Sequence, residues 1–507
     1  MKSASPARQA AAVILLATVV RLILAGGMGL GIDESYMVSA SHAFQLSYFD
    51  HPPVSWWMEL AIQRVTGLHS PLIVRLPFIA LFAGTSALMY GFTNRLFGAR
   101  AALWAVAGLN ISPVFSLAFG TWVLPDGPLD FFLVAAAWAL ARAVGVARPE
   151  LDAEPEPGFW PLAGLFAGLA MTSKYNAALN LLGALLFLVF DARGRRALAS
   201  AGPWIACLIA LLVFSPVLIW NALNAWVSFG YQGARATGFG IHTLRPFIVW
   251  AGEALFVAPW IWVPMVWLLV RGLGRGADRR ARFLALLAII PVLLFSVIAF
   301  WSSRKILYHW AAPGYLMLFP LLGDWVARLG EAARRRVRAV AIGTAGLLTI
   351  AVLFIAAELN FAIVPGFDAW FPPGRSPELQ AIDWTSFRKA LARRGDLDRP
   401  NLAIAALRWF DAGKIAYAIG PGVPVAVFEG DPHEFGITTP PQSLIGENVL
   451  IAAMPGSEAA IMWRYAPRFR SITVAKPIDI IHHGHVLLRI PILLGHDLRS
   501  WPADARR

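Results

Sequence analysis

The chain has 507 residues, of which 58% are hydrophobic and only 14% are charged, and its mean hydropathy is +0.61. A soluble protein carries about 25% charged residues, so this composition excludes an ordinary soluble domain and indicates a polytopic membrane protein. The net charge of +13 lies in short loops between apolar runs, which makes it a signal for membrane orientation and not for nucleic acid. The single cysteine, Cys207, excludes an intramolecular disulfide and a cysteine-based metal site.

Eleven apolar stretches approach the length of about 20 residues that crosses a bilayer as a helix. They are 10–30, 74–95, 101–119, 129–146, 159–173, 176–190, 203–221, 246–270, 283–301, 308–326 and 339–358. The first stretch can also be read as a cleaved signal peptide, but the many spans that follow favour a retained first helix. Stretches 129–146 and 159–173 are short, which favours tilted or partly re-entrant segments.

The loops between these stretches alternate in charge. One set is basic and lies on the side of Lys2 and Arg8: Arg95, Arg100, Arg148, Arg193, Arg195, Arg196, Arg271, Arg275, Arg279, Arg280, Arg282, Arg334, Arg335, Arg336 and Arg338. The positive-inside rule makes this side cytoplasmic. With an odd number of spans, we expect a cytoplasmic N-terminus, a periplasmic C-terminus and a bacterial inner membrane location.

Charges on the opposite side break the pattern. They are Asp33, Glu34, Asp50, Asp126, Lys174, Arg235, Arg245, Arg304 and Lys305. Charge near a bilayer is expensive unless it is used, so we interpret these residues as an active site on the outer side.

The composition changes after residue 360, where Pro, Gly and charged residues increase. Strand-like runs alternate with helix-like runs: Leu402–Leu407, 411–419, Val423–Phe428, Val449–Ala453, 457–465 and His485–Ile490. This alternation predicts a small α/β domain. We therefore expect a helical membrane module over 1–359 and an α/β domain over 360–507, joined by a linker at Pro372-Pro373 and Arg375-Ser376-Pro377.

The first outer loop, 31–73, carries the acidic pair Asp33-Glu34 where the first helix ends. Val54–Leu60 is aromatic and apolar, which predicts an amphipathic interfacial helix. Asp50-His51-Pro52-Pro53 predicts a stiff turn before that helix. We interpret the loop as a lid over the acidic pair; the alternative is an ordinary loop with solvated acids.

Glycosyl transfer from a lipid carrier is the chemistry that suits these residues. A carboxylate removes the proton of the acceptor as a general base, and cations near the membrane surface meet the phosphate that leaves. Lys174, Arg304 and Lys305 stand at the required depth. The alternative for each cation is a side chain that extends from a helix end to the lipid headgroups.

The chain also resembles a known family along residues 10 to about 330. The matching stretches occur in the family's order: Asp33-Glu34-Ser35-Tyr36, Tyr48-Phe49-Asp50-His51-Pro52-Pro53, Leu124-Pro125-Asp126-Gly127-Pro128-Leu129, Thr172-Ser173-Lys174-Tyr175-Asn176, Ser215-Pro216-Val217-Leu218-Ile219-Trp220-Asn221 and Tyr308-His309-Trp310-Ala311-Ala312-Pro313-Gly314-Tyr315. This set resembles bacterial membrane glycosyltransferases of the GT-C superfamily, and within it the protein mannosyltransferase and aminoarabinose lipid A transferase group (glycosyltransferase families 39 and 83).

The resemblance implies an inverting transferase that uses a polyprenyl-phosphate sugar at a periplasmic site. It implies that Asp33 is the family's catalytic acidic residue. It also implies that Asp126 is a second acidic residue, which orients the acceptor or binds a cation. Glu34 joins the catalytic set, while Lys174, Arg304 and Lys305 are implied to bind the donor phosphate. The predicted substrate-binding residues are Tyr36, Asp50, His51, Tyr308 and His309. For His51, a structural role in the turn competes with help in proton transfer.

No cofactor is predicted, apart from a divalent cation that stays open. His482-His483-Gly484-His485 is read as a surface turn in preference to a metal site. Gly164 and Gly168 predict close helix packing within the bundle. Glu253 is a deep carboxylate that would pair with an arginine, line the carrier-lipid groove or bind the acceptor.

The expected partners are a polyprenyl-phosphate-linked donor, membrane lipids and a periplasmic acceptor such as lipid A, lipopolysaccharide core or another envelope glycan. Neither nucleic acid nor a nucleotide sugar is expected to bind. A protein O-mannosyltransferase is the alternative within the family. A transporter or flippase of a lipid-linked glycan would predict related halves and charges near the membrane midplane. The sequence shows no such internal repeat, and the acids of the outer loops lie at the outer rim, which argues against this alternative. A non-catalytic scaffold is the third alternative.

Overall fold

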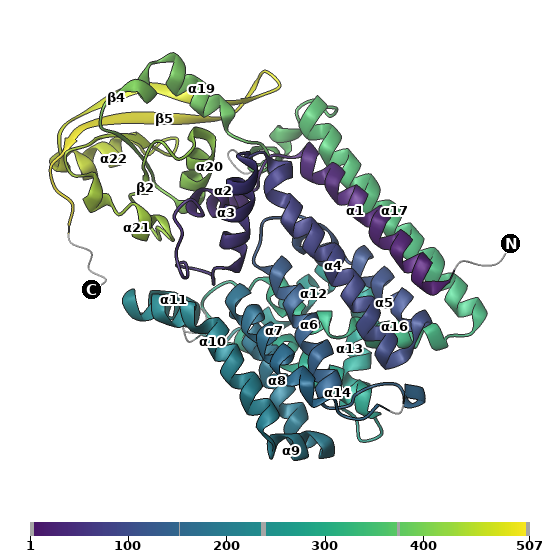
Figure 1. Cartoon of the computed structure of the whole chain (residues 1–507). Coiled ribbons are helices and arrows are strands. Elements are labelled where there is room, and N and C mark those ends of the chain that lie inside the picture. The colour runs from purple at the N-terminus through teal and green to yellow at the C-terminus, as the bar shows by residue number, and fades with distance from the viewer. Residues whose placement is uncertain (1–4, 152, 235–239, 373–375, 503–507) are drawn as a thin grey trace. The chain divides into compact units, whose positions relative to one another are not determined.

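The computed structural model describes residues 5–151, 153–234, 240–372 and 376–502 (Figure 1). Lys2, Arg235 and the linker residues Pro373 and Arg375 lie outside the described residues. The chain divides into two compact units. Unit 1 comprises Met1–Ile23, Gln45–Ser55 and Arg75–Val352, and unit 2 comprises Leu24–Phe44, Trp56–Val74 and Leu353–Arg507.

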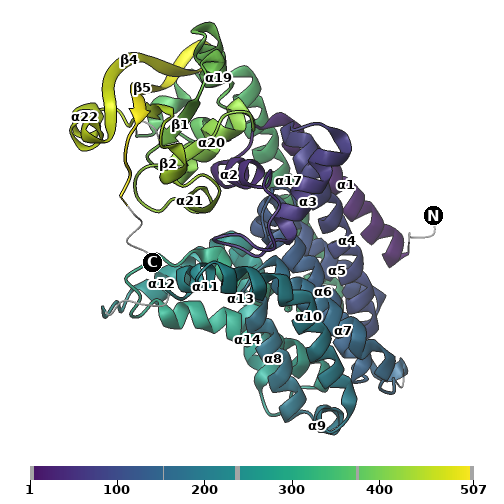
Figure 2. The same ribbon diagram turned by 60° about the vertical axis from the view of Figure 1, so that its left-hand side comes forward.

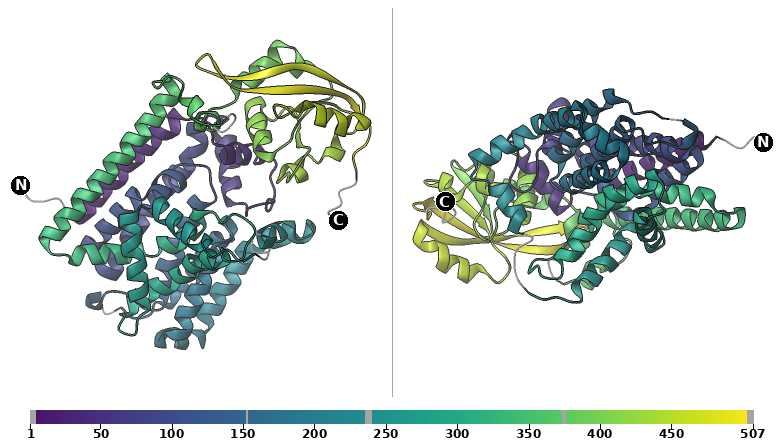
Figure 3. Two further views of the ribbon diagram at one scale, coloured as in Figure 1. Left: turned by 180° about the vertical axis from the view of Figure 1, so that it is seen from behind. Right: turned by 90° about the horizontal axis from the view of Figure 1, so that it is seen from below.

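Unit 1 is helical, and three of its helices, α1, α4 and α17, continue into unit 2. In chain order the α-helices are α1 (Pro6–Gly27), α4 (Pro71–Phe97), α5 (Ala99–Ile111), α6 (Asp126–Ala143), α7 (Trp160–Ser173), α8 (Ala177–Phe190), α9 (Ala192–Leu198), α10 (Ala201–Leu223), α11 (Val227–Gly233), α12 (Arg245–Val257), α13 (Pro259–Leu273), α14 (Arg279–Ile298), α15 (Ala312–Leu316), α16 (Phe319–Arg328) and α17 (Glu331–Phe361). A π-helix, η1 (Val114–Phe119), follows α5, and short 3₁₀ turns are η2 (Pro149–Leu151), η3 (Pro157–Phe159) and η5 (Tyr308–Ala311). Figures 1 and 3 agree in placing α1 and α17 side by side.

The predicted count of eleven spans is not confirmed. Among the described residues, five single helices are long and apolar enough to cross a membrane, namely α1, α4, α10, α14 and α17. Two bent pairs, α8 with α9 and α12 with α13, raise the number to seven if each pair is one span. Of the other predicted spans, 101–119 and 308–326 are divided, and 159–173 forms a helix of 14 residues. The span 129–146 corresponds to α6, which has 18 residues but carries three charged side chains.

The stretch 246–270, predicted as a single span, is divided into two helices. Helices α12 and α13 meet at an angle of 116°, and Ala258 between them has a φ of 87°. A non-glycine residue rarely adopts that backbone region, and Pro259 follows directly, so the helix cannot continue through this point. Apolar composition alone gives no sign of such a break.

Small residues bring α7 against α10, as the Gly164 and Gly168 pair predicts. A Cβ atom on Gly164 would lie 2.3 Å from the Ala206 carbonyl oxygen, and one on Gly168 would lie 2.7 Å from Cβ of Val213. Larger residues would therefore force the two helices apart. Close backbone approach of this kind is how helices pack in a membrane, where burial from water contributes little.

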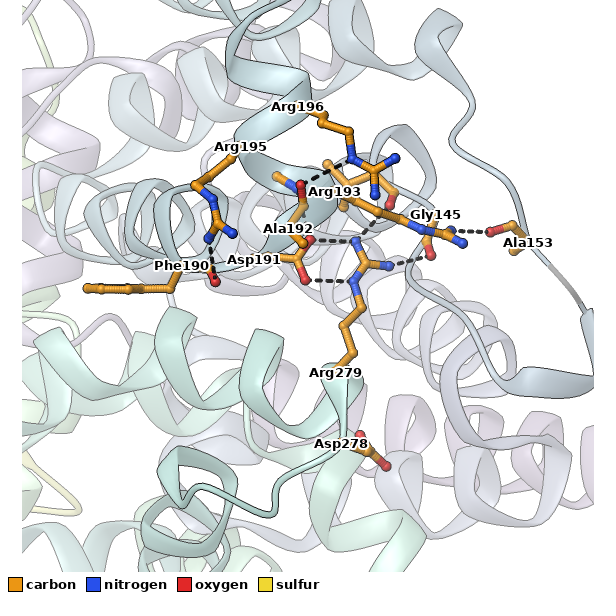
Figure 4. A network of polar contacts seen from close by, with 12 residues as sticks. Gly145, Ala153, Phe190, Asp191, Ala192, Arg193, Arg195, Arg196, Asp278 and Arg279 are labelled. Carbon is orange, nitrogen blue, oxygen red and sulfur yellow. Dashed lines mark hydrogen bonds and ion pairs between the residues drawn. The ribbon is translucent and has the colours of Figure 1, made fainter.

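An ion network joins the ends of three helices in unit 1 (Figure 4). Arg279, the first residue of α14, donates two hydrogen bonds of 2.8 Å to the Asp191 carboxylate between α8 and α9. It also donates to the carbonyl oxygens of Gly145 and Val144, just after α6, at 2.6 and 2.9 Å. These carbonyls lie at a helix end, where the α-helix leaves them without an internal partner, so Arg279 serves as a shared cap.

Unit 2 contains a mixed five-stranded sheet in the order β2-β1-β3-β5-β4 (Figure 2). The strands are β1 (Leu402–Ala406), β2 (Val425–Val427), β3 (Asn448–Ala452), β4 (Phe469–His482) and β5 (His485–Leu498). Strand β1 is parallel to β2 and β3, and β5 is antiparallel to β3 and β4. The α/β expectation for this segment agrees with the structure, except that β4 was not predicted.

Helices complete unit 2. They are α2 (Ile32–Ala40), α3 (Val54–Thr66), η6 (Phe367–Trp370), α18 (Pro377–Ala381), α19 (Thr385–Arg393), η7 (Asp396–Asp398), α20 (Trp409–Ile419), α21 (Phe435–Thr438), η8 (Pro441–Leu444), α22 (Glu458–Tyr465) and η9 (Ala466–Arg468). The presence of α2 and most of α3 differs from the predicted division, which assigned the whole first outer loop to the membrane module. The acidic pair and the rest of residues 31–44 belong to the same compact unit as the sheet, whereas residues 45–55 of the loop belong to unit 1.

We predict that Arg279→Ala lowers the free energy of unfolding by about 2 kcal/mol, because Asp191 and two carbonyl groups lose a charged donor. Thermal unfolding in detergent measures the change. Arg196→Ala is the control, since Arg196 is exposed and makes one long hydrogen bond to Ala192. Equal midpoints for both variants would contradict a stabilising role for Arg279.

Candidate active site

The acidic pair lies in the first turn of α2 in unit 2, and its two carboxylates differ in environment. Asp33 is exposed, whereas Glu34 is 3% exposed. The Glu34 carboxylate accepts a hydrogen bond of 2.9 Å from the Gly31 backbone, which closes the first turn of its own helix. The N-terminal end of a helix stabilises nearby negative charge, which favours ionised Asp33. Asp33 is thus the member of the pair that a substrate can reach.

Tyr36, predicted to bind substrate, is buried in an aromatic cluster of unit 2. Its ring lies 5.5 Å from Trp56, 5.1 Å from Trp409 and 5.7 Å from His433 between ring centroids. Its hydroxyl oxygen accepts a hydrogen bond of 3.0 Å from the Glu434 backbone. With 2% exposure, Tyr36 connects α2 to the α/β domain, and direct substrate contact stays a prediction.

Glu59, on α3, is a buried acid that the sequence reasoning did not select as a site residue. It is fully buried, and Gln63 donates to its Oε1 atom at 2.7 Å. Among the described residues its Oε2 atom has no hydrogen-bond partner. Burial, reinforced by the charge of Glu34, raises the pKa of Glu59 to about 8. Glu59 therefore keeps its proton at neutral pH.

Asp126 and Lys174, both predicted site residues, form a buried ion pair in unit 1. The Lys174 ammonium lies 2.8 Å from each carboxylate oxygen of Asp126, and the side chains are 6% and 4% exposed. Asp126 begins α6, and Lys174 follows the last residue of α7. One turn after Asp126, Asp130 is fully buried, and neither of its carboxylate oxygens has a partner among the described residues.

A small pocket of about 10 Å³, roughly the space of one water molecule, lies beside this pair within unit 1. Its lining consists of His51, Lys174, Tyr175, Asn176, Gln232 and Trp310. Lys174 has three N–H donors, and two contacts go to Asp126, so one donor remains for a group in the pocket. The pocket thus combines a buried cation with amide and imidazole groups, which suits an anionic ligand.

Asp50 and His51 lie in unit 1, and His51 lines the pocket beside Lys174. His51 lies 3.8 Å from the Asp50 carboxylate, and the Asp50 carbonyl accepts a hydrogen bond of 2.5 Å from Gln232. This contact holds the backbone of the turn at Asp50, and the structural role of His51 stays a prediction. Because His51 also lines the pocket, substrate contact by this residue stays a prediction.

The predicted residues near 304–309 lie around η5. Arg304 and Lys305 are exposed in the preceding loop. A Cβ atom on Gly252 would lie 2.3 Å from the Tyr308 ring, so Tyr308 packs flat on α12. The His309 ring lies 6.3 Å from that of Phe119 between centroids.

Glu253 has a different partner from those that we considered. Its Oε2 atom accepts a hydrogen bond of 2.6 Å from the Tyr315 hydroxyl, whose oxygen in turn accepts from the Trp262 indole at 2.8 Å. An arginine partner was one of three alternatives for Glu253, and the other two, a place in the carrier-lipid groove and acceptor binding, stay predictions. A phenol satisfies a buried carboxyl group without adding charge to the bundle.

Among the described residues, no group of three or more His, Cys, Asp or Glu side chains is arranged to hold a metal ion. In the His482–His485 turn, His482 contacts the Glu378 carboxylate, and the His483 Nε2–H group donates to the Leu359 carbonyl oxygen at 3.2 Å. These histidines therefore have protein partners.

Comparisons with known proteins place these features in context. The family model described as dolichyl-phosphate-mannose-protein mannosyltransferase matches residues 50–220. Lipid A galacturonosyltransferase RgtD of Rhizobium johnstonii is 26% identical over 330 residues, which are 62% of this chain and 64% of that protein. Lipopolysaccharide core galacturonosyltransferase RgtA of the same organism is 28% identical over 210 residues, 41% of this chain and 40% of that protein. The chain therefore spans less than two thirds of the length of the curated relatives that it matches.

The solved structures extend the comparison to nearly the whole chain. The crystal structure of ArnT from Cupriavidus metallidurans in the apo state superposes with a TM-score of 0.65 and covers 95% of this chain and 97% of that chain, at 14% identity. The same protein bound to undecaprenyl phosphate gives a TM-score of 0.61. The chain thus shares the fold of ArnT, and the resemblance to GT-C membrane glycosyltransferases is confirmed.

Glu59 predicts a pH dependence of stability. The unfolded carboxyl loses its proton near pH 4.5, whereas the folded one keeps it up to about pH 8. Between these values the unfolded state binds fewer protons, so stability falls as the pH rises. Glu59→Gln removes this contribution. The thermal midpoint of the variant minus that of the wild type should therefore rise by at least about 2 °C from pH 5 to pH 8. Parallel midpoint curves in detergent would contradict the raised pKa.

The Asp126–Lys174 pair predicts non-additive effects of substitution. Asp126→Asn or Lys174→Met alone leaves one buried group uncompensated and should lower the free energy of unfolding by about 3–5 kcal/mol. The double variant removes both charges and should recover part of that loss, as a double-mutant cycle on thermal unfolding measures. Strictly additive losses would show that the two side chains do not interact in the membrane-embedded protein.

Proposed function

We propose that the protein is a membrane glycosyltransferase that moves a sugar from a polyprenyl-phosphate carrier to an envelope glycolipid. Lipid A or the lipopolysaccharide core is the proposed acceptor, and a uronic acid such as galacturonic acid is the proposed sugar. The names of the relatives RgtD and RgtA support both assignments. The shared fold with ArnT, which was solved with undecaprenyl phosphate, supports the polyprenyl carrier.

The observation that carries this proposal is the pocket with Lys174 in its wall. When the bond between the sugar and the carrier phosphate breaks, the phosphate that leaves gains negative charge. A cation held in a fixed position in a low-dielectric site stabilises that charge in the transition state. In the proposed role, the Lys174 donor that Asp126 leaves available binds the phosphate, while Asp126 fixes the direction of the ammonium group. Arg304 and Lys305 are proposed to attract the anionic carrier.

Asp33 is the proposed general base. In the reaction the acceptor oxygen attacks the anomeric carbon, the bond from that carbon to the phosphate oxygen breaks, and polyprenyl phosphate leaves. The proton of the acceptor hydroxyl passes to the Asp33 carboxylate, and attack from the opposite face inverts the anomeric configuration. Support for this role comes from the exposure of Asp33 at the start of α2, in contrast to buried Glu34.

Transfer to protein hydroxyl groups is the second candidate function. The description of the matching family model, a protein mannosyltransferase, favours it. The two candidates share the carrier, the base and the fold, and they differ in the acceptor. We propose a bacterial inner membrane location with the site on the periplasmic side, on the basis of the basic loops that the positive-inside rule makes cytoplasmic.

We predict that deletion of the protein and Asp33→Asn remove the same sugar-sized mass from one envelope molecule. Mass spectrometry of glycolipids and glycoproteins from wild-type, deletion and complemented strains measures this. Asp398→Asn, at an exposed position of unit 2, is the control and should restore the wild-type profile. The molecule that loses mass distinguishes lipid from protein acceptors. A wild-type profile with Asp33→Asn at normal protein levels would contradict the role of Asp33 as base.

A further inference from the structure

Lys414, on α20 of the α/β domain, is a buried lysine whose ammonium group contacts backbone carbonyls. It is 1% exposed. Its ammonium donates to the carbonyl oxygens of Gln380 and Ile382 at 2.7 and 3.0 Å, and also to that of Leu30. Three donors thus meet three backbone acceptors, which is the condition under which a buried ammonium is tolerated. An apolar residue at this position would remove a charged donor from all three carbonyls.

Both backbone polar groups of Leu30, its carbonyl and its N–H, make hydrogen bonds to side chains. Its carbonyl accepts from Lys414, and its N–H donates to the Asp383 carboxylate at 2.9 Å. The preceding residue, Gly29, lies so near this segment that a Cβ atom would come within 2.6 Å of the Asp383 nitrogen. These contacts fix the chain three residues before Asp33, at the point from which α2 begins.

Helix α2 itself packs on the same element that carries Lys414. A Cβ atom on Gly413 would lie 2.8 Å from Cα of Tyr36, so the two helices touch through their backbones. The Ser39 hydroxyl lies 3.3 Å from the Gly413 carbonyl oxygen. Together with the bond from Glu434 to the Tyr36 hydroxyl, these contacts attach α2 along its length to the α/β domain.

We propose that Lys414 and Asp383 are positioning residues for the candidate base, and that the α/β domain acts in catalysis by fixing the backbone that carries Asp33. This inference rests on the proposed function. Neither residue touches a substrate in this role. Each acts through Leu30, because a base must lie within hydrogen-bond distance of the proton it removes, and a displacement of about 1 Å can lower a rate by about a hundredfold.

The test is a kinetic and structural comparison of Lys414→Met with Lys389→Met. Lys389 is exposed on α19 of the same unit, so the second variant makes the same chemical change without touching Leu30. For sugar transfer in nanodiscs, Lys414→Met should lower kcat at least about tenfold and leave the KM for the carrier-linked donor within about twofold. Lys389→Met should match the wild type in both. An unchanged kcat for folded Lys414→Met would overturn the proposal, as would a loss confined to KM.

Hydrogen exchange gives a readout that does not depend on activity. In Lys414→Met, backbone amides of residues 30–38 should exchange at least about tenfold faster, while those of β1 and β3 keep their protection. Unchanged exchange at 30–38 overturns the proposal, and faster exchange throughout the sheet indicates unfolding of the domain, in which case Asp383→Asn carries the same test. If the wild-type protein transfers no sugar, the proposed function fails, and the exchange data still decide whether Lys414 orders α2.

Discussion

A charge that is buried among apolar helices must be compensated where it lies, and the pair of Lys174 and Asp126 meets this constraint in unit 1. The pair joins the start of α6 to the end of α7, so it also fixes two helix ends beside the pocket. A lone lysine at this depth would be expensive and mobile. With a carboxylate that occupies two of its contacts, the ammonium is held in place and still has one donor for a ligand.

Unit 2 holds two buried ionisable groups of its own, Lys414 and Glu59. The Lys414 ammonium is surrounded by backbone carbonyls, and the pKa of Glu59 is raised to about 8 so that this acid stays neutral. Hydrogen bonds to the Leu30 backbone and rings packed around Tyr36 hold the segment from Leu30 to Tyr36. The outcome is that Asp33 is the exposed carboxylate of a firmly held helix, which is what a general base requires.

Much of the fold follows from patterns that are local in sequence. Runs of apolar residues located β1, β2 and β3, and the helix α20, within one or two residues, and the pair of Gly164 and Gly168 indicated the contact of α7 with α10. Strand β4 was not predicted, because Arg470, Lys476 and Pro477 interrupt its apolar alternation. Most of its residues are also solvent-exposed or partly exposed. The helix break at Ala258 was not predicted, because the composition does not show a positive φ. In the site, the resemblance indicated Asp126 and Lys174 as site residues, but not that they pair across 48 residues. The hydrogen bond from Lys414 to Leu30 joins residues that are 384 positions apart, and no local sequence pattern predicts such a contact.

The central claim is that the sugar comes from a polyprenyl-phosphate carrier. The most direct measurement is sugar transfer to lipid A by purified protein in liposomes, supplied with polyprenyl-phosphate-linked galacturonic acid or with the corresponding nucleotide sugar. The account predicts transfer from the carrier-linked donor alone, with inversion at the anomeric carbon and release of one polyprenyl phosphate for each sugar transferred. Transfer from the nucleotide sugar without the carrier, or retention of the anomeric configuration, would contradict it.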